Sequence, residues 1–300
     1  MCKQEIELLT KQVEDLAKEL KSCHIEIQEL RSKAIQKQKK VFLKFEVHLC
    51  DHCNLNCKGC DHFSPIAPPK FTDTKTFSKD MHRIAELFGD RVLRIHLLGG
   101  EPLLAPNVCD YISIAREAFP NKELTIIDIL TNGTLLLKQP KAFWDACKEY
   151  SIKIRITKYP ISLDYDEICK FVSNQGVECD FFNDLSNGEK GLYKVCLTKD
   201  PHTDPHKNFF NCFDGNRCIM LKNGKLYPCT LIPNVEHFNK YFGETFYETN
   251  FDSIDIHQAK SAEEIFEFLH NPVPFCRYCK RDDIESLSWE KSQKAKDEWM

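Results

Sequence analysis

The sequence predicts an α/β protein in which parallel strands alternate with helices. Aliphatic runs of strand length are separated by amphipathic stretches of helical length, and crossovers of this kind make successive strands parallel. The expected strands are 41–49, 91–98, 124–131, 152–159 and 177–183, with a sixth within 192–198. The expected helices are 75–88, 107–119, 141–150 and 164–174.

The first forty residues are expected to form a separate helical unit. Apolar or small residues recur there at alternating spacings of three and four: Ile6, Leu9, Val13, Leu16, Leu20, Cys23, Ile27, Leu30 and Ala34. A seam this narrow, with charged residues between, predicts a coiled coil of about four heptads and a homo-oligomer joined through it. One amphipathic helix packed on its own domain is the alternative. Residues 37–40 are expected to be a solvated linker.

Composition excludes several classes of protein. The chain has 300 residues, and 41 basic against 45 acidic residues give a net charge of −4, so a nucleic-acid partner is not expected. No apolar run approaches the roughly 18 residues of a membrane span. The first thirty residues are charged throughout and lack the apolar region of a secretory signal, which predicts a cytoplasmic protein. The chain has sixteen cysteines, and nine of them are gathered at 50–60, 212–229 and 276–279, which favours metal binding over disulfides.

Three cysteines directly after the first strand suggest an iron–sulfur site. Cys53, Cys57 and Cys60 have CxxxCxxC spacing, so they can hold three irons of a [4Fe–4S] cube and leave the fourth iron without a protein ligand. A small molecule could bind that open iron. A zinc site is the alternative for this motif taken alone. Cys50 forms a rival CxxC pair with Cys53, but is expected to be a partly buried thiol at the strand end.

Two further motifs follow the next two strands. Gly99, Gly100, Glu101 and Pro102 end the second strand, where paired glycines allow close backbone approach and the proline restricts the turn. Asn132 lies in the Thr-Asn-Gly sequence that ends the third strand. Because the strands are expected to be parallel, all three motifs belong at the same edge of the sheet.

CxxxCxxC, GGEP and TNG, in this order at strand ends, resemble the radical S-adenosylmethionine (SAM) superfamily over roughly residues 41–183. The resemblance implies a partial (β/α)6 TIM-like barrel, with Cys53, Cys57 and Cys60 on a cluster whose open iron chelates SAM. It implies that Gly99, Gly100, Glu101 and Pro102 hold the methionine part, and that Asn132 lies near the ribose. Family members often place an aromatic residue before the third cysteine. That position is Gly59 here, so Phe63 is expected to pack near the adenine instead.

Polar and aliphatic residues alternate along the expected strands. In the first strand, aliphatic or aromatic residues alternate with Lys44, Glu46 and His48. The same alternation places Arg94 and His96 in the second strand, and Lys153, Arg155 and Thr157 in the fourth. Helices would cover the aliphatic face, which leaves a polar lumen for the SAM carboxylate and a hydrophilic substrate. Arg155 is therefore expected among the cofactor-binding residues. Charges that pair with one another inside the barrel are the alternative.

A second constellation comprises Cys212, Cys218, Cys229, Cys276 and Cys279. Asn223-Gly224 predicts a tight turn that sets Cys218 opposite Cys229 on a hairpin. This region resembles the auxiliary-cluster domain called SPASM, and its shortened form, twitch, is the better match. The resemblance implies one additional [4Fe–4S] cluster. Four of the five thiols are needed, all five stay candidates, and zinc is again the alternative.

The expected domains are therefore a coiled-coil helix and linker (1–40), a radical SAM partial barrel (41–205) and a twitch-like region with a C-terminal helix (206–300). The resemblance implies reductive SAM cleavage to a 5′-deoxyadenosyl radical, which abstracts hydrogen from the substrate. The auxiliary cluster favours dehydrogenation or epimerisation, and the polar lumen favours a sugar or nucleotide sugar. A flavodoxin or ferredoxin is the expected electron donor. The alternatives are a peptide-modifying SPASM-type enzyme and a catalytically silent Fe–S scaffold.

Overall fold

The computed structural model describes residues 9–16, 20, 43–182, 192–194, 197–200, 202–212, 215, 217–281 and 286–300. The chain forms two compact units, Met1–Phe42 and Leu43–Met300. In the first unit, residues 9–16 are helical, and Leu9, Val13 and Leu16 are exposed. The other seam positions, Leu20 excepted, lie outside the described residues, so the coiled coil stays a prediction. Among the described residues, no helix is long and apolar enough to cross a membrane.

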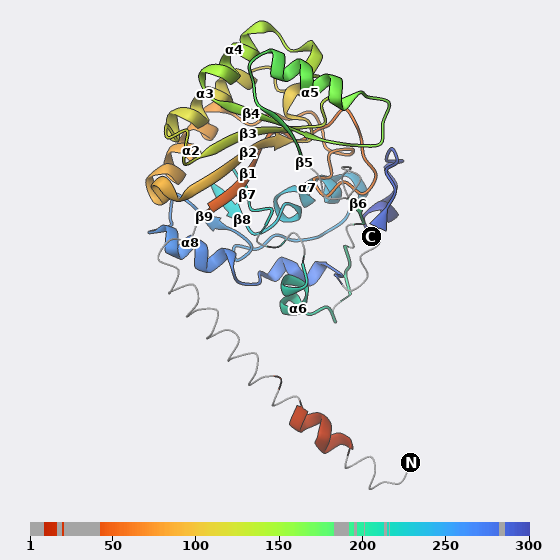
Figure 1. Ribbon diagram of the computed structural model, residues 1–300. Helices are drawn as coiled ribbons and strands as arrows, with labels where there is room; N and C mark the ends of the chain where they lie inside the picture. Colours follow the sequence, from red (N-terminus) through yellow and green to blue (C-terminus); the bar gives the residue numbers. More distant parts are fainter. Residues whose placement is uncertain are drawn as a thin grey trace. The chain divides into compact units, whose positions relative to one another are not determined.

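The second unit is built around an eight-stranded sheet with the strand order β5-β4-β3-β2-β1-β7-β8-β9 (Figure 1). The strands β1 to β5 are parallel neighbours, and β7 pairs with β1 in the same direction. Their bounds are β1 Leu43–Cys50, β2 Val92–Gly99, β3 Ile126–Thr131, β4 Ile152–Thr157, β5 Cys179–Phe182, β7 Met220–Lys222, β8 Lys225–Tyr227 and β9 Ile254–Asp255.

Four helices connect the parallel strands and cover one face of the sheet: α2 Thr74–Phe88, α3 Val108–Ala118, α4 Lys141–Glu149 and α5 Tyr165–Asn174 (Figure 1). Asp73 and Asp164 cap α2 and α5 by accepting hydrogen bonds from backbone N–H groups in the first turn. The C-terminal third adds α6 Pro205–Phe210, α7 Leu231–Phe242 and α8 Ala262–Leu269. This arrangement confirms the predicted α/β class and the strand–helix alternation.

Alternation along β1 shows why the helices cover that face. Leu43, Phe45, Val47 and Leu49 are all buried, whereas Lys44 between them is exposed. Side chains two residues apart share one face of a strand, so a β1 of this sequence buries its aliphatic set against the helices. Burying each such side chain stabilises the fold by roughly 1.5–3 kcal/mol.

The structure differs from the expectation at the sixth strand. The segment predicted to supply it forms β6, Leu192–Tyr193, which pairs with β10, Ser286–Leu287, in a separate two-stranded sheet. The main sheet grows instead from its β1 edge, where β7 pairs Met220 with Glu46 and Leu221 with Val47. The C-terminal region is thereby joined to the barrel, and the expected boundary near residue 205 falls inside one compact unit.

The predicted hairpin turn is present between β7 and β8. Asn223 and Gly224 both have positive φ angles, 51° and 75°, as a two-residue hairpin turn of this kind requires. The ladder pairs Met220 with Tyr227. Cys218 and Cys229 lie two residues beyond its last pair, so the ladder does not pair them.

A second apolar core lies beneath the C-terminal region. Phe63, Phe238 and Trp299 are fully buried there, with ring centroids 5.6 Å apart for Phe63 and Phe238 and 6.0 Å apart for Phe63 and Trp299. This core joins residues that follow the cysteine motif to the last residues of the chain.

Candidate active site and metal centres

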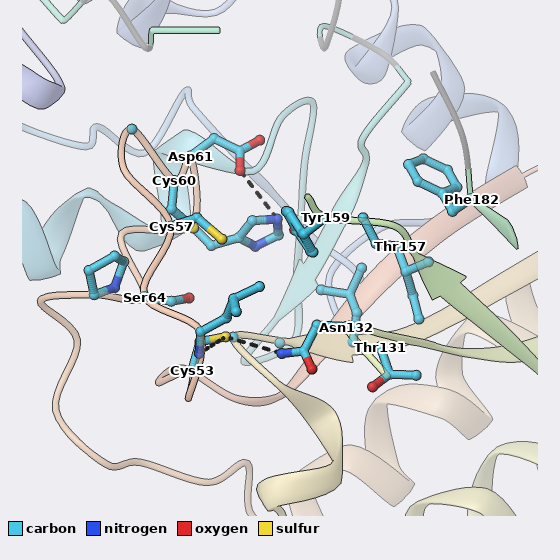
Figure 2. Close-up of a pocket in the computed structure, with 18 of the residues that line it drawn as sticks. Cys53, Cys57, Cys60, Asp61, Ser64, Thr131, Asn132, Thr157, Tyr159 and Phe182 are labelled. Carbon is cyan, nitrogen blue, oxygen red and sulfur yellow. Dashed lines mark hydrogen bonds and ion pairs between the residues drawn. The ribbon is translucent and has the colours of Figure 1, made fainter. Parts of the chain in front are cut away.

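The loop that follows β1 carries the three motif cysteines into one cavity. Cys53, Cys57 and Cys60 all line a cavity of about 120 Å³ at the carboxyl ends of the parallel strands (Figure 2). The loop needs left-handed backbone at Asn56, φ 56°, and at Gly59, φ 66°, two residue types that adopt it readily. The structure therefore brings together the thiols that the sequence singled out.

Gly99 and Gly100 form the opposite wall, and close backbone contact explains why both are glycine. A Cβ atom on Gly100 would lie 2.0 Å from the His52 carbonyl oxygen, and one on Gly99 would lie 2.3 Å from the Cys50 carbonyl oxygen. Gly100 N–H donates to the Cys50 oxygen at 2.9 Å, and Glu101 N–H donates to the His52 oxygen at 3.0 Å. The GGEP turn is thus docked directly on the cysteine loop.

Glu101 ties GGEP to TNG from beneath the cavity. Its carboxylate is fully buried and accepts hydrogen bonds from the Thr131 hydroxyl at 2.6 Å, Asn132 N–H at 3.0 Å and Leu103 N–H at 3.2 Å. Burial raises the pKa of Glu101 to about 7, although these hydrogen bonds oppose the rise. Neither Glu101 nor Pro102 lines the cavity. Both residues lie beneath the cavity, where they support Gly99, Gly100 and Asn132.

Asn132 is the residue of the TNG motif that reaches the cavity. Its side-chain amide donates to the Asn54 side-chain oxygen at 2.9 Å and points at the Cys53 sulfur, 3.8 Å away (Figure 2). Leu55 N–H also points at the Cys53 sulfur, at 3.4 Å. Donors around this sulfur favour its thiolate form, which a cluster ligand requires.

Burial acts in the opposite direction on the free thiols. It raises the pKa of Cys53 to about 12, with Glu101 contributing, and raises the pKa of Cys60 further, with Asp61 contributing. A buried thiolate without a counter-charge is unfavourable, so these thiols lose their protons only when a cation binds them. The donor set therefore fits a metal cluster better than it fits free nucleophiles.

Cys50 lies outside the cavity wall. Its buried thiol donates to the Glu101 carbonyl oxygen at 2.9 Å, and burial raises its pKa to about 12. The position agrees with the expectation of a structural thiol at the strand end.

Apart from Thr157, the residues at the polar end of the cavity were not singled out by the sequence. Thr157 and Tyr159 follow from the end of β4, Phe182 ends β5, and Asp61 and His62 come directly after the third cysteine (Figure 2). Burial raises the pKa of Tyr159 well above its usual value, and nearby cysteines contribute. Their position at the carboxyl ends of strands was the feature of the sequence that could have identified them as cavity residues.

A chain of hydrogen bonds leads from this cavity through the sheet. Nδ1 of His62 lies 2.6 Å from Nε2 of His48, and Nδ1 of His48 lies 3.2 Å from the Asp51 carboxylate. Burial lowers the pKa of His48 to about 3, so the ring is neutral. The Asp51 carboxylate requires the proton on Nδ1 of His48, and His62 therefore donates from Nδ1 to Nε2 of His48. Burial opposes ionisation of Asp51, but the nearby His237 ring, 3.3 Å away, and the hydrogen bond from His48 outweigh it and lower the Asp51 pKa.

Two predicted cofactor residues lie elsewhere. Phe63 is fully buried in the second core and does not line the cavity. Arg155 pairs with Asp180 on β5, with its Nε 2.8 Å from the carboxylate, and also lies outside the cavity wall.

Of the alternating polar residues on the strands, Thr157 alone lines the cavity, since Arg94 and His96 both contact the buried Asp128. Internal pairing, the alternative noted above, thus accounts for these charges.

A second, smaller cavity of about 20 Å³ gathers the other cysteines. Cys212, Cys229, Cys276 and Cys279 line it, and Cys218 does not. Burial raises the pKa of Cys276 to about 12 and the pKa of Cys229 further, with charge on neighbouring thiols of the group contributing to both. Four thiols around one cavity are a complete ligand set for a [4Fe–4S] cluster or for zinc.

Asn208, on α6, holds the CxxC segment of this second site. Its side-chain amide donates to the carbonyl oxygens of Cys276, at 2.9 Å, and Cys279, and its oxygen accepts from Arg281 N–H at 3.4 Å. The helix α6 therefore helps to hold the second site. Sequence reasoning missed Asn208 because an asparagine in a short helix has no distinguishing spacing.

Comparison with known proteins agrees with this geometry. Residues 44–156 match the sequence model of the 4Fe-4S single cluster domain family. The uncharacterized protein MJ0907 of Methanocaldococcus jannaschii is 26% identical over 200 residues, 63% of this chain and 66% of that protein, so about a third of that relative is not covered.

A solved structure shares the fold, and a second was found with a lower score. BtrN in complex with AdoMet and 2-DOIA aligns with a TM-score of 0.50 and 18% identity, over 80% of this chain and 94% of that one. Native anSMEcpe with bound AdoMet aligns with a TM-score of 0.48 and 13% identity, over 79% and 88% of the two chains. The 4Fe-4S domain match spans all three ordered motifs, and the shared fold agrees with the resemblance to the radical SAM superfamily.

Proposed function

We propose that this protein cleaves SAM reductively at a [4Fe–4S] cluster held by Cys53, Cys57 and Cys60, and removes a hydrogen atom from a polar small molecule. The observation that carries the proposal is the contrast between the two cysteine sites. Three thiols line the larger cavity together with polar side chains, whereas four thiols line the smaller one. Three ligands leave one iron open to SAM, and four close the cluster.

The cluster and SAM together supply an electron and a 5′-deoxyadenosyl radical, which takes a hydrogen atom from an unactivated C–H bond. The chain's own residues orient the reactants. Gly99 and Gly100 line the cavity and present backbone on which the methionine part can lie. Asn132 is assigned to the ribose side, and Tyr159 and Phe182 to the wall that excludes water.

A dehydrogenation fits the two sites best. Conversion of an alcohol or amine to a carbonyl or imine removes a hydrogen atom, an electron and a proton. The 5′-deoxyadenosyl radical would supply the acceptor for the hydrogen atom, a second cluster would supply the acceptor for the electron, and a base on the chain would take the proton. Cys212, Cys229, Cys276 and Cys279 are the proposed ligands of the electron-accepting cluster. Support for His62 as the base comes from its place in the cavity wall and its hydrogen bond to His48, which leads away from the cavity.

The proposed substrate is a hydroxylated or amino-bearing metabolite of the sugar type. Asp61, His62, Ser64 and Thr157 offer hydrogen-bonding groups in the cavity wall that such a molecule can use. A flavodoxin or ferredoxin is the proposed electron donor. A peptide substrate, named above as the alternative, is the competing outcome of a substrate screen.

The test is anaerobic reconstitution, reduction with dithionite in the presence of SAM, and chromatography of 5′-deoxyadenosine. The wild type is expected to form it and to hold roughly eight irons per chain. A variant with Cys53→Ala, Cys57→Ala and Cys60→Ala is expected to form none and to hold about four irons. Cys50→Ser is the matched control, because its thiol lies outside the cavity, and it should keep both. A wild type that holds eight irons and leaves SAM intact would favour a silent Fe–S scaffold.

A further inference from the structure

The last fifteen residues lie across the cysteine loop. We call residues 286–300 the C-terminal strap. Cys57 forms an antiparallel β-bridge with Lys291. On either side of that bridge, Lys58 N–H donates to the Glu290 oxygen at 2.9 Å, and Ser292 N–H donates to the Asn56 oxygen at 2.8 Å. The strap is therefore bonded to the middle of the CxxxCxxC segment through backbone groups.

One strap side chain contacts a cysteine sulfur directly. The indole Nε1–H of Trp289, a half-buried residue, donates to the Cys57 sulfur at 3.2 Å. An indole N–H is a donor only, so the bond requires the sulfur to accept. Cys57 is 8% exposed, which keeps water from competing for that sulfur.

The strap also explains the glycine where the family often has an aromatic residue. A Cβ on Gly59 would lie 2.9 Å from Cδ1 of Leu287 and 3.5 Å from the Glu298 oxygen. Beyond it, the Trp299 indole donates to the Cys60 carbonyl oxygen at 2.9 Å. Strap residues thus occupy the space beside Gly59 and hold the loop at Asn56, Cys57, Lys58 and Cys60.

The geometry points to Trp289 as a positioning residue that sets the reduction potential of the cluster proposed at Cys53, Cys57 and Cys60. The inference rests on the proposed function, since it concerns the cluster that delivers the electron to SAM. A reduced cluster carries one more negative charge, part of which lies on the cysteine sulfurs. A hydrogen bond to one of those sulfurs stabilises the reduced state more than the oxidised state and raises the potential.

The test is a potentiometric titration of the reconstituted full chain followed by electron paramagnetic resonance. Trp289→Phe removes the donor and keeps an aromatic ring, so the midpoint potential of the first cluster should become more negative, while that of the second cluster stays unchanged. Glu290→Gln is the matched control, because it removes the exposed strap ion pair to Lys58, 2.8 Å, and keeps Trp289. Trp144→Phe controls for loss of an indole elsewhere. Neither control should shift the first potential.

A second measurement needs no variant. In wild-type protein labelled with [indole-15N]tryptophan, the reduced first cluster should show hyperfine coupling to 15N, and absence of that coupling would overturn the inference. An unchanged first potential in a Trp289→Phe variant that holds both clusters would also overturn it, and so would equal shifts of both potentials. These results leave the proposed function standing. A wild type with no cluster at Cys53, Cys57 and Cys60 would overturn the proposed function and this inference together.

Discussion

At the scale of single residues, Glu101 shows how a buried carboxylate can support the site without lining the cavity. Its three hydrogen bonds join the GGEP turn to Thr131, Asn132 and Leu103. The sequence pointed to Glu101 as a group that holds methionine. The structure places it one layer below, because the turn of Pro102–Leu104 folds its side chain back under the loop.

The burial of Glu101 should make the free energy of unfolding depend on pH. The folded-state pKa of Glu101, about 7, lies above the ordinary value of 4.5, so the folded state binds the proton more tightly than the unfolded state. The contribution of Glu101 is therefore full below pH 4.5 and falls as the pH rises to 7. The loss is at most about 3.5 kcal/mol at roughly 1.4 kcal/mol per pKa unit. Urea unfolding of the wild type relative to Glu101→Gln should show a free-energy difference that falls over this range. A flat difference would contradict the assignment.

The second cysteine site allows a matched pair of substitutions. Cys276→Ser removes a thiol from the cavity wall, and iron is expected to fall from about eight to about four per chain. Cys218→Ser removes one that lies outside the wall and should leave the iron content unchanged. Iron and zinc are counted by plasma emission spectrometry after anaerobic reconstitution. Equal losses in both variants would mean that Cys218 is a ligand, and zinc in place of iron would identify a structural metal site.

At the scale of elements, the polar faces of the strands are paired across the sheet. Arg94 and His96 on β2 both bond to Asp128 on β3, with Arg94 Nη1 2.9 Å and His96 Nδ1 2.5 Å from its carboxylate oxygens. Asp128 is fully buried. Adjacent parallel strands place His96 beside Asp128 in register, which makes the pairing possible.

Removing the shared carboxylate should be costly. Asp128→Ala leaves a half-buried arginine without its partner, and the free energy of unfolding is expected to fall by about 3 kcal/mol. Lys153→Ala breaks a neighbouring pair with the exposed Glu178 and should lower it by less than about 1 kcal/mol. Denaturant unfolding of the two variants under identical conditions checks the difference. Equal effects would show that Asp128 contributes no more than a surface ion pair.

The N-terminal helix presents an apolar seam to solvent. Leu9, Val13 and Leu16 are 50%, 64% and 61% exposed in the described part of that unit. Burial of such a seam between copies would stabilise an oligomer. Leu9→Lys with Leu16→Lys should therefore dissociate the full chain to a monomer in size-exclusion chromatography with light scattering. Lys11→Glu with Glu14→Lys leaves the seam intact and should not. A monomeric wild type would refute the predicted coiled coil.

At the scale of the whole unit from Leu43 to Met300, short segments distant in sequence complete the sites. The strand β7 extends the sheet at β1, and the hairpin that follows leads to Cys229. The CxxC segment and the strap come from the last thirty residues. The C-terminal strap thus covers the first site, and the β7–β8 hairpin joins the second site to the same sheet.

Much of this was predictable because it is local. The five parallel strands and four helices follow from apolar periodicity, and their observed ends lie within a few residues of the expected ones. The cavity residues Cys53, Cys57, Cys60, Gly99, Gly100 and Asn132 were recognisable since each motif ends a strand. Parallel strands bring such ends to one edge.

The rest required tertiary structure because it depends on contacts between segments without a repeating pattern. No spacing relates Trp289 to Cys57, Asn208 to Cys279 or Arg155 to Asp180, and each pairing exists only in the folded chain. The sequence alone determined the fold class, the cluster motif and the edge of the sheet that bears it. The tertiary structure decided which four of five cysteines surround the second cavity, and which side chains support the first one instead of lining it. Strand periodicity is local, whereas the position of each loop depends on the packing of the whole unit.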